Sequence, residues 1–111
     1  GEGFEYYLIE EDGEAAGYLA LVPEKEPGAL FLSKVYVRSA MRRRGLGAAA
    51  LEFAEQRARE LGLGRIYLTC NKHNAGSLAF YAAHGYENAG PIVTDIGNGY
   101  VMDDWVMEKG V

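Results

Sequence analysis

An arginine- and glycine-rich segment in the middle of the chain carries the residue types best suited to bind a ligand. It reads Val35-Tyr-Val-Arg-Ser-Ala-Met-Arg-Arg-Arg-Gly-Leu-Gly-Ala48. Glycines allow close approach of the backbone to a ligand, and a helix start offers N–H groups without intrahelical partners. Arginine guanidinium groups add forked donors that match phosphate oxygens. The segment therefore predicts an anion site, for which phosphate is the usual ligand.

Two common phosphate-binding motifs do not fit this segment. A P-loop requires Gly-Lys followed by Ser or Thr, but Ala48-Ala49-Ala50 follows the second glycine. A dinucleotide fold also has a G-x-G-x-x-A pattern, and Gly45 to Ala50 matches it. Here, however, the glycines lie well beyond Val37 rather than in a tight strand–helix turn, and the region around Thr69 holds no acid for a ribose. Both nucleotide-binding motifs are therefore excluded.

The secondary-structure elements around this segment follow from the periodicity of apolar residues along the chain. Alternating apolar residues predict strands over residues 4–10, 16–22 and 29–37. A helical period predicts a helix over 46–61. Its apolar stripe includes Ala50, Phe53, Ala54 and Ala58, which places Phe53 on the buried face and Glu55 on the solvent face. A strand over 65–70, a helix over 74–84 capped by Asn74, and strands over 86–92 and 100–109 follow. The order β-β-β-α-β-α-β-β predicts an α+β fold with a mixed sheet.

Length and charge limit the classes of protein. The chain has 111 residues and a net charge of −5, which predicts one domain over residues 1–111. Basic residues gather in positions 34–72 of an otherwise acidic chain, which favours a local anion site over a nucleic-acid surface. Apolar runs are too short to cross a membrane. A single cysteine, Cys70, indicates a reducing, cytoplasmic setting, and one Cys with two His residues predicts no metal site.

Two blocks of the chain resemble the GNAT superfamily of N-acetyltransferases. The run from Arg42 to Gly47 matches the family signature [RQ]-x-x-G-x-[GA], and a strand precedes it at the family's spacing. Asn74-x-x-Ser77-x-x-x-Tyr81, followed by Gly-Tyr, is similar to the family's Asn…Tyr…Gly-Phe segment. Residues 100–109 resemble its last strand. The resemblance implies a central, mixed and mostly antiparallel sheet with flanking helices, here lacking the usual amino-terminal strand and helices.

The resemblance also implies acetyl-CoA as the acetyl donor and a role for each matching position. Backbone N–H groups from Arg43 to Ala48 would hold the pyrophosphate. Val35 and Val37 would pair with the pantetheine arm as an added strand, and Asn74 would contact the arm from its other side. The residues assigned to binding are Val35, Tyr36, Val37, Arg42, Arg43, Arg44, Gly45, Leu46, Gly47, Ala48, Asn74 and Ser77.

The implied reaction is attack of a neutral amine on the thioester, with Tyr81 protonating the departing thiolate. A strand N–H such as that of Val37 would stabilise the oxyanion. Phenol and thiol have ordinary pKa values of about 10 and 8.5, so a tyrosine is a reasonable proton donor to a thiolate. The strand before the signature lacks the family's glutamate, which leaves the general base open among Asp103, Asp104, Glu10 and the solvent.

Two functions of different classes follow. The first is an acetyl-CoA-dependent N-acetyltransferase acting on a primary amine of a small molecule or a protein. The second is a non-catalytic CoA-binding or interaction module, or an inactive truncated domain of the same family. In both cases we expect no nucleic-acid or membrane partner, and a homodimer is left open.

Overall fold

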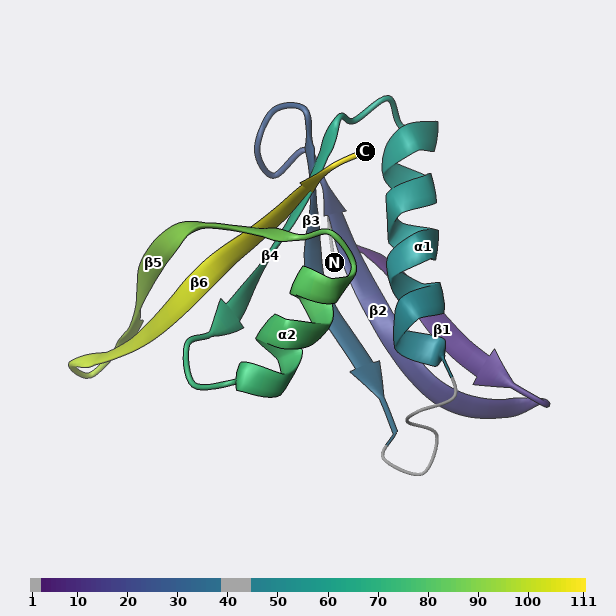
Figure 1. The fold of residues 1–111 in the computed structure, drawn as a ribbon, viewed down its shortest axis with the longest axis horizontal. Helices are drawn as coiled ribbons and strands as arrows, with labels where there is room; N and C mark the ends of the chain where they lie inside the picture. Colours follow the sequence, from purple (N-terminus) through teal and green to yellow (C-terminus); the bar gives the residue numbers. More distant parts are fainter. Residues whose placement is uncertain (1–2, 39–44) are drawn as a thin grey trace. The chain divides into compact units, whose positions relative to one another are not determined.

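The computed structural model describes residues 3–38 and 45–111, which form six strands and two helices (Figure 1). In chain order these are β1 (Glu5–Glu11), β2 (Glu14–Pro23), β3 (Ala29–Val37), α1 (Leu46–Glu60), β4 (Arg65–Asn71), α2 (Ala75–Ala83), β5 (Glu87–Gly97) and β6 (Tyr100–Gly110). The predicted order and α+β class are confirmed. No helix in these two ranges is long and apolar enough to cross a membrane.

The hairpin between β5 and β6 is tighter than the sequence predicts. We expected β5 to end at Ile92, but it continues to Gly97. The turn then needs only Asn98 and Gly99, both with positive φ, at 54° and 79°. Two successive residues of positive φ suit the twist of a two-residue hairpin, which allows the longer strands to pair up to the turn.

The chain forms two compact units, the first comprising residues 1–66 with Val111 and the second residues 67–110. In the first, β1, β2 and β3 form an antiparallel meander, and α1 packs against β2 and β3. Tyr18 lies opposite both Leu8 of β1 and Tyr36 of β3. A Cβ on Gly17 would overlap the carbonyl oxygen of Tyr36, so this close approach of β2 and β3 requires glycine.

Helix α1 turns a different face to the sheet from the one expected. Its buried residues are Ala50, Leu51, Ala54, Glu55 and Ala58. The expectation for Glu55 is wrong, because only 6% of this residue is exposed. Phe53, expected on the buried face, is 44% exposed. The small alanines pack closely against the sheet, and the buried stripe is displaced by about one residue position from the predicted one.

The second unit contains β4 from Tyr67 onward, together with α2, β5 and β6, and its strands lie in the order β4-β6-β5. The β5–β6 pair is antiparallel and places Pro91 opposite Trp105. Helix α2 begins after Asn74, as predicted, and the chain leaves it through Gly85, whose φ is +91°. Lys109 of β6 donates a hydrogen bond of 3.0 Å from Nζ to the carbonyl oxygen of His84, which completes the carboxyl end of α2.

Candidate functional site

The start of α1 has the features of an anion-binding helix end. Gly45 adopts the left-handed conformation, with φ 75° and ψ 9°, and its carbonyl oxygen accepts the N–H of Ala49 at 3.0 Å. No side chain caps this helix within the described residues, and its first turn contains no acidic residue. Leu46, Gly47 and Ala48 form that turn. The N–H groups and the positive end of the helix dipole can therefore receive an anion. Arg42, Arg43 and Arg44, assigned to the same site, lie outside the described residues.

The backbone of β3 shows which residues direct their N–H groups away from β2. The N–H of Arg38 donates to the carbonyl of Ala16 in β2 at 2.7 Å. Because hydrogen bonding alternates along an antiparallel pair, the N–H of Tyr36 also points toward β2. Val35 and Val37 lie between these positions, so their N–H groups point to the opposite edge of β3. A strand-like ligand would pair with N–H groups that point in this direction, and the pairing assigned to Val35 and Val37 stays a prediction.

Because the N–H of Tyr36 points toward β2, this residue would contact a ligand through its side chain. Its ring is 41% exposed and lies 5.7 Å from the ring of Tyr18. A contribution of Tyr36 to ligand binding would therefore come from the exposed phenol. Its role stays a prediction.

The turn into α2 is organised by two asparagines. The side-chain oxygen of Asn71 accepts the N–H of His73 at 2.9 Å, and its carbonyl accepts the N–H of Asn74 at 3.0 Å. The side-chain oxygen of Asn74 accepts the N–H of Ser77 at 3.2 Å, which caps the helix. Since the Asn74 oxygen serves the cap, its NH2 group is the part that can donate to a ligand. The predicted capping role of Asn74 is confirmed, and the ligand roles of Asn74 and Ser77 stay predictions.

Tyr81, the predicted proton donor, lies half-buried on α2. Its ring packs edge-on against the rings of Phe80 and Tyr86, with distances between ring centres of 5.4 Å and 5.9 Å. Burial, and secondarily the charge of Cys70, raise the pKa of Tyr81 above its ordinary value. The phenol is therefore protonated at neutral pH, which is the form that can donate a proton.

Cys70 of β4 is a buried, free thiol. Burial first, and the negative charge of Asp104 second, raise the pKa of this thiol. A raised pKa keeps the sulfur in its neutral form, which is a weak nucleophile and a weak metal ligand. Among residues 3–38 and 45–111, no three His, Cys, Asp or Glu side chains are grouped to hold a metal ion.

The three carboxylates considered as general base have different surroundings. Glu10 is exposed on β1. Asp103 is also exposed and forms an ion pair of 2.8 Å with Lys72. Asp104 is only 5% exposed, and within the described part of the chain its Oδ1 atom is buried without a hydrogen-bond partner. None of these contacts assigns the base, which stays open.

Sequence reasoning missed one group of contacts beside Asn74. Lys72, in the turn between β4 and α2, reaches Asp103 and also lies 4.4 Å from the centre of the Trp105 ring. Both partners are in β6, some thirty positions further along the chain. The pairing depends on how β6 is placed beside β4, so no local pattern in the sequence indicates it.

Comparison with known proteins identifies the class to which these features belong. The model of the acetyltransferase (GNAT) family matches residues 1–86. An uncharacterized N-acetyltransferase of Lactobacillus delbrueckii subsp. lactis is 36% identical over 86 residues, covering 72% of this chain and 50% of the relative. The chain therefore belongs to the GNAT acetyltransferase family, and it spans about half the length of the curated relatives it matches.

Solved structures show the same fold. An IAA acetyltransferase from Bacillus cereus superposes with a TM-score of 0.86 at 18% identity, covering 99% of this chain and 79% of that one. A ribosomal-protein-alanine N-acetyltransferase from Brucella melitensis has a TM-score of 0.80 at 27% identity and coverages of 99% and 70%. A GNAT acetyltransferase from Elizabethkingia anophelis with acetyl-CoA bound has a TM-score of 0.80 at 17% identity and coverages of 98% and 77%.

Proposed function

We propose that this chain is the acetyl-donor-binding part of an N-acetyltransferase that transfers the acetyl group of acetyl-CoA to a primary amine of a small molecule or a protein. The observation that carries the proposal is the start of α1. A left-handed glycine there precedes a first turn, Leu46 to Ala48, that has neither an acidic residue nor a side-chain cap, at the position of the family signature. The acetyl-CoA bound to the Elizabethkingia anophelis relative supports the choice of donor.

The pyrophosphate of the donor would bind at this helix start. Backbone N–H groups of Gly45 to Ala48 would donate to its oxygens, and Arg42, Arg43 and Arg44 would add positive charge. A hydrogen bond between an N–H group and a charged oxygen is about twice as strong as one between neutral groups. The first turn of α1 therefore supplies affinity without any side-chain acid that would repel the ligand.

Two strips of polar groups suit the pantetheine arm, which carries amide groups. Val35 and Val37 direct N–H groups along one edge of β3, at the spacing of a strand partner. The NH2 group of Asn74 would donate a hydrogen bond to a carbonyl of the arm. Main-chain pairing of this kind gives affinity through hydrogen bonds and leaves the strand geometry unchanged.

The transfer itself is a direct attack through a tetrahedral intermediate. The neutral amine forms a bond to the acetyl carbon, and the carbonyl electron pair moves to its oxygen, which a β3 N–H such as that of Val37 would stabilise. When the C–S bond breaks, the electron pair goes to sulfur, and Tyr81 donates its proton to the thiolate. The attacking nitrogen is protonated once it is bonded to the acetyl carbon, and it loses this proton to a base or to water.

The experiment that tests this function measures release of the CoA thiol from acetyl-CoA with a panel of primary amines. Thiol release that depends on an amine, together with an acetylated product seen by mass spectrometry, is the expected result. A non-catalytic CoA-binding module is the second candidate, favoured by the absence of a glutamate from β3. It would bind the donor and release no thiol with any amine.

A further inference from the structure

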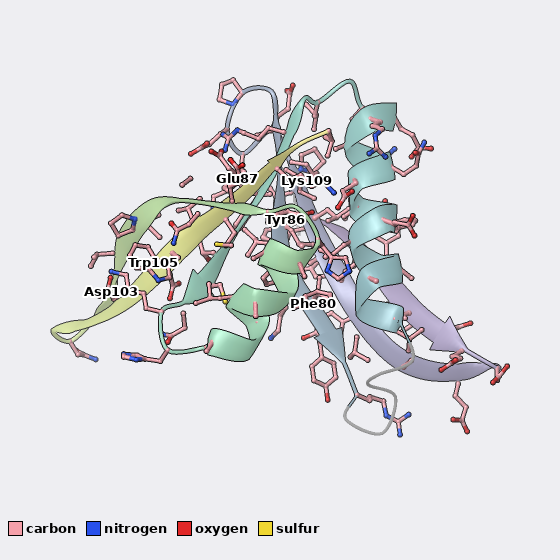
Figure 2. The ribbon with its side chains drawn as sticks, in the orientation of Figure 1. Phe80, Tyr86, Glu87, Asp103, Trp105 and Lys109 are labelled. Carbon is pink, nitrogen blue, oxygen red and sulfur yellow. The ribbon has the colours of Figure 1, made fainter. Side chains whose placement is uncertain are left out.

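Lys72, in the turn that carries Asn74, contacts two residues of β6. The Nζ atom of Lys72 lies 2.8 Å from Oδ1 of Asp103 and 4.4 Å from the centre of the Trp105 ring. Asp103 and Trp105 are two positions apart on β6, so they occupy the same face of the strand (Figure 2). The Lys72 side chain is 25% exposed and that of Asp103 is 53% exposed. We call these three residues the Lys72 bracket.

Lys72 lies within a backbone turn whose other residues are joined by hydrogen bonds. Lys72 lies between Asn71 and His73, and the His73 N–H donates to the side chain of Asn71. The next N–H, that of Asn74, donates to the Asn71 carbonyl. Asn74 then caps α2 through the Ser77 N–H. Asn71 therefore restrains both His73 and Asn74 across the turn, Asn74 restrains the start of α2, and Lys72 links the same turn to a neighbouring strand.

We propose that Lys72 is a positioning residue for the acetyl donor: by joining the β4–α2 turn to Asp103 and Trp105, it holds the Asn74 carboxamide in the orientation that binds the pantetheine arm. This inference rests on the proposed function. Asp103, which the sequence left among the candidates for the base, is on this view the ionic partner of the bracket. Lys72 acts through Asn74 and does not touch the reacting atoms.

The size of the effect follows from how such contacts behave at a partly exposed site. Ion pairs and cation–π contacts there are individually modest, so their loss loosens the turn without unfolding the unit. The apparent affinity for a ligand falls in proportion to the fraction of molecules whose site is correctly arranged. We expect the Kd for acetyl-CoA to rise roughly three- to tenfold when the bracket is broken.

The decisive variants are Lys72→Met and Lys72→Arg. Lys72→Met keeps an apolar stem over Trp105 but removes the charge, whereas Lys72→Arg keeps the charge and should restore binding. The expected result for Lys72→Met is a weaker Kd and a higher KM for acetyl-CoA, with kcat at saturation unchanged within about twofold. Asp103→Asn should have a similar effect, and adding it to Lys72→Met should cause little further loss.

Lys25→Met is the matched control. Lys25 also contacts an aromatic ring, lying 4.5 Å from the centre of Phe31, but it belongs to the loop between β2 and β3. Its removal should leave the Kd unchanged. A purely structural role for Lys72 would lower the melting temperature while the folded molecules kept their Kd and KM, and this result would overturn the proposal.

Amide hydrogen exchange separates this inference from the proposed function. The N–H of Ser77 is protected by the Asn74 side chain, so Lys72→Met should speed its exchange even without a ligand. Unchanged exchange together with an unchanged Kd would overturn the bracket. If the unmodified chain bound no acetyl-CoA, the proposed function and the ligand role of Lys72 would both fail. Faster Ser77 exchange in Lys72→Met would then show that the bracket orders the turn but has no role in binding the donor.

Discussion

Arg57 of α1 donates two parallel hydrogen bonds to the carboxylate of Glu5 in β1. The Nε atom of Arg57 lies 2.9 Å from Oε1 of Glu5, and a terminal guanidinium nitrogen lies 2.9 Å from Oε2. Bidentate pairs of this kind fix geometry as well as charge. The hydrogen bond from Arg57 is the main reason that the pKa of Glu5 lies below its ordinary value. The pair joins the first strand to the helix that begins at the proposed anion site.

The lowered pKa of Glu5 predicts how stability depends on pH. A carboxyl whose pKa is lower in the folded than in the unfolded state stabilises the fold above its unfolded pKa, and this contribution is lost as the pH falls through the folded value. Glu5→Gln should therefore lower the urea midpoint at pH 7 and flatten the loss of stability below about pH 4.5. Urea titrations from pH 7 to pH 3 test this, and parallel curves for the two proteins would contradict it.

Gly17→Ala should destabilise the meander strongly. The added methyl group would overlap the Tyr36 carbonyl, so β2 and β3 would have to move apart. Forcing atoms into a packed site costs about 1–3 kcal/mol, which should appear as a lower free energy of unfolding. Gly64→Ala is the control, because a Cβ there meets no atom within 4 Å and Gly64 is not among the glycines with positive φ. Equal stability of the two variants would refute the close approach.

Tyr81→Phe should slow acetylation while acetyl-CoA binds nearly as before. Removing a general acid costs about a hundredfold or more in rate. Tyr6→Phe is the matched control, because Tyr6 is a 62% exposed tyrosine of β1 and should keep the full rate. Since the pKa of Tyr81 is raised, the rate of the unmodified enzyme should not fall through loss of this proton until the pH exceeds about 10. A full-rate Tyr81→Phe enzyme would place the proton donor elsewhere.

Asp104→Asn should make Cys70 more reactive. The Asp104 charge contributes to raising the pKa of the Cys70 thiol, so removing it should lower that pKa, although burial keeps it above the ordinary value. The test is to measure the rate of Cys70 alkylation as a function of pH, corrected for the fraction of unfolded protein. An unchanged pH profile would contradict the contribution of Asp104 to the raised pKa of Cys70.

Much of the fold and part of the candidate site could be predicted from the sequence because they depend on local features. The alternation of apolar and polar residues within the strands, and the helical period over residues 46–61, specify the element order. The Asn74 cap is equally local, since its acceptor and donor are three residues apart. Such signals need no knowledge of what packs against the element.

The features that could not be predicted depend on packing between distant segments. The burial of Glu55 reflects the rotation of α1 against its sheet, which a helical period alone does not determine. Lys72 meets Asp103 and Trp105 only because β6 returns beside β4. The arginines at positions 42–44 lie outside the described residues, so their role at the anion site stays a prediction.

Calorimetric titration with acetyl-CoA tests the central claim most directly, with NAD and ATP as comparison ligands. The account predicts saturable binding of acetyl-CoA and much weaker binding of the other two. Gly47→Trp should abolish this binding by blocking approach to the first turn of α1, whereas Gly64→Trp should retain it. No binding of acetyl-CoA by the unmodified chain, or equal binding by Gly47→Trp, would contradict the assignment of the donor site to the start of α1.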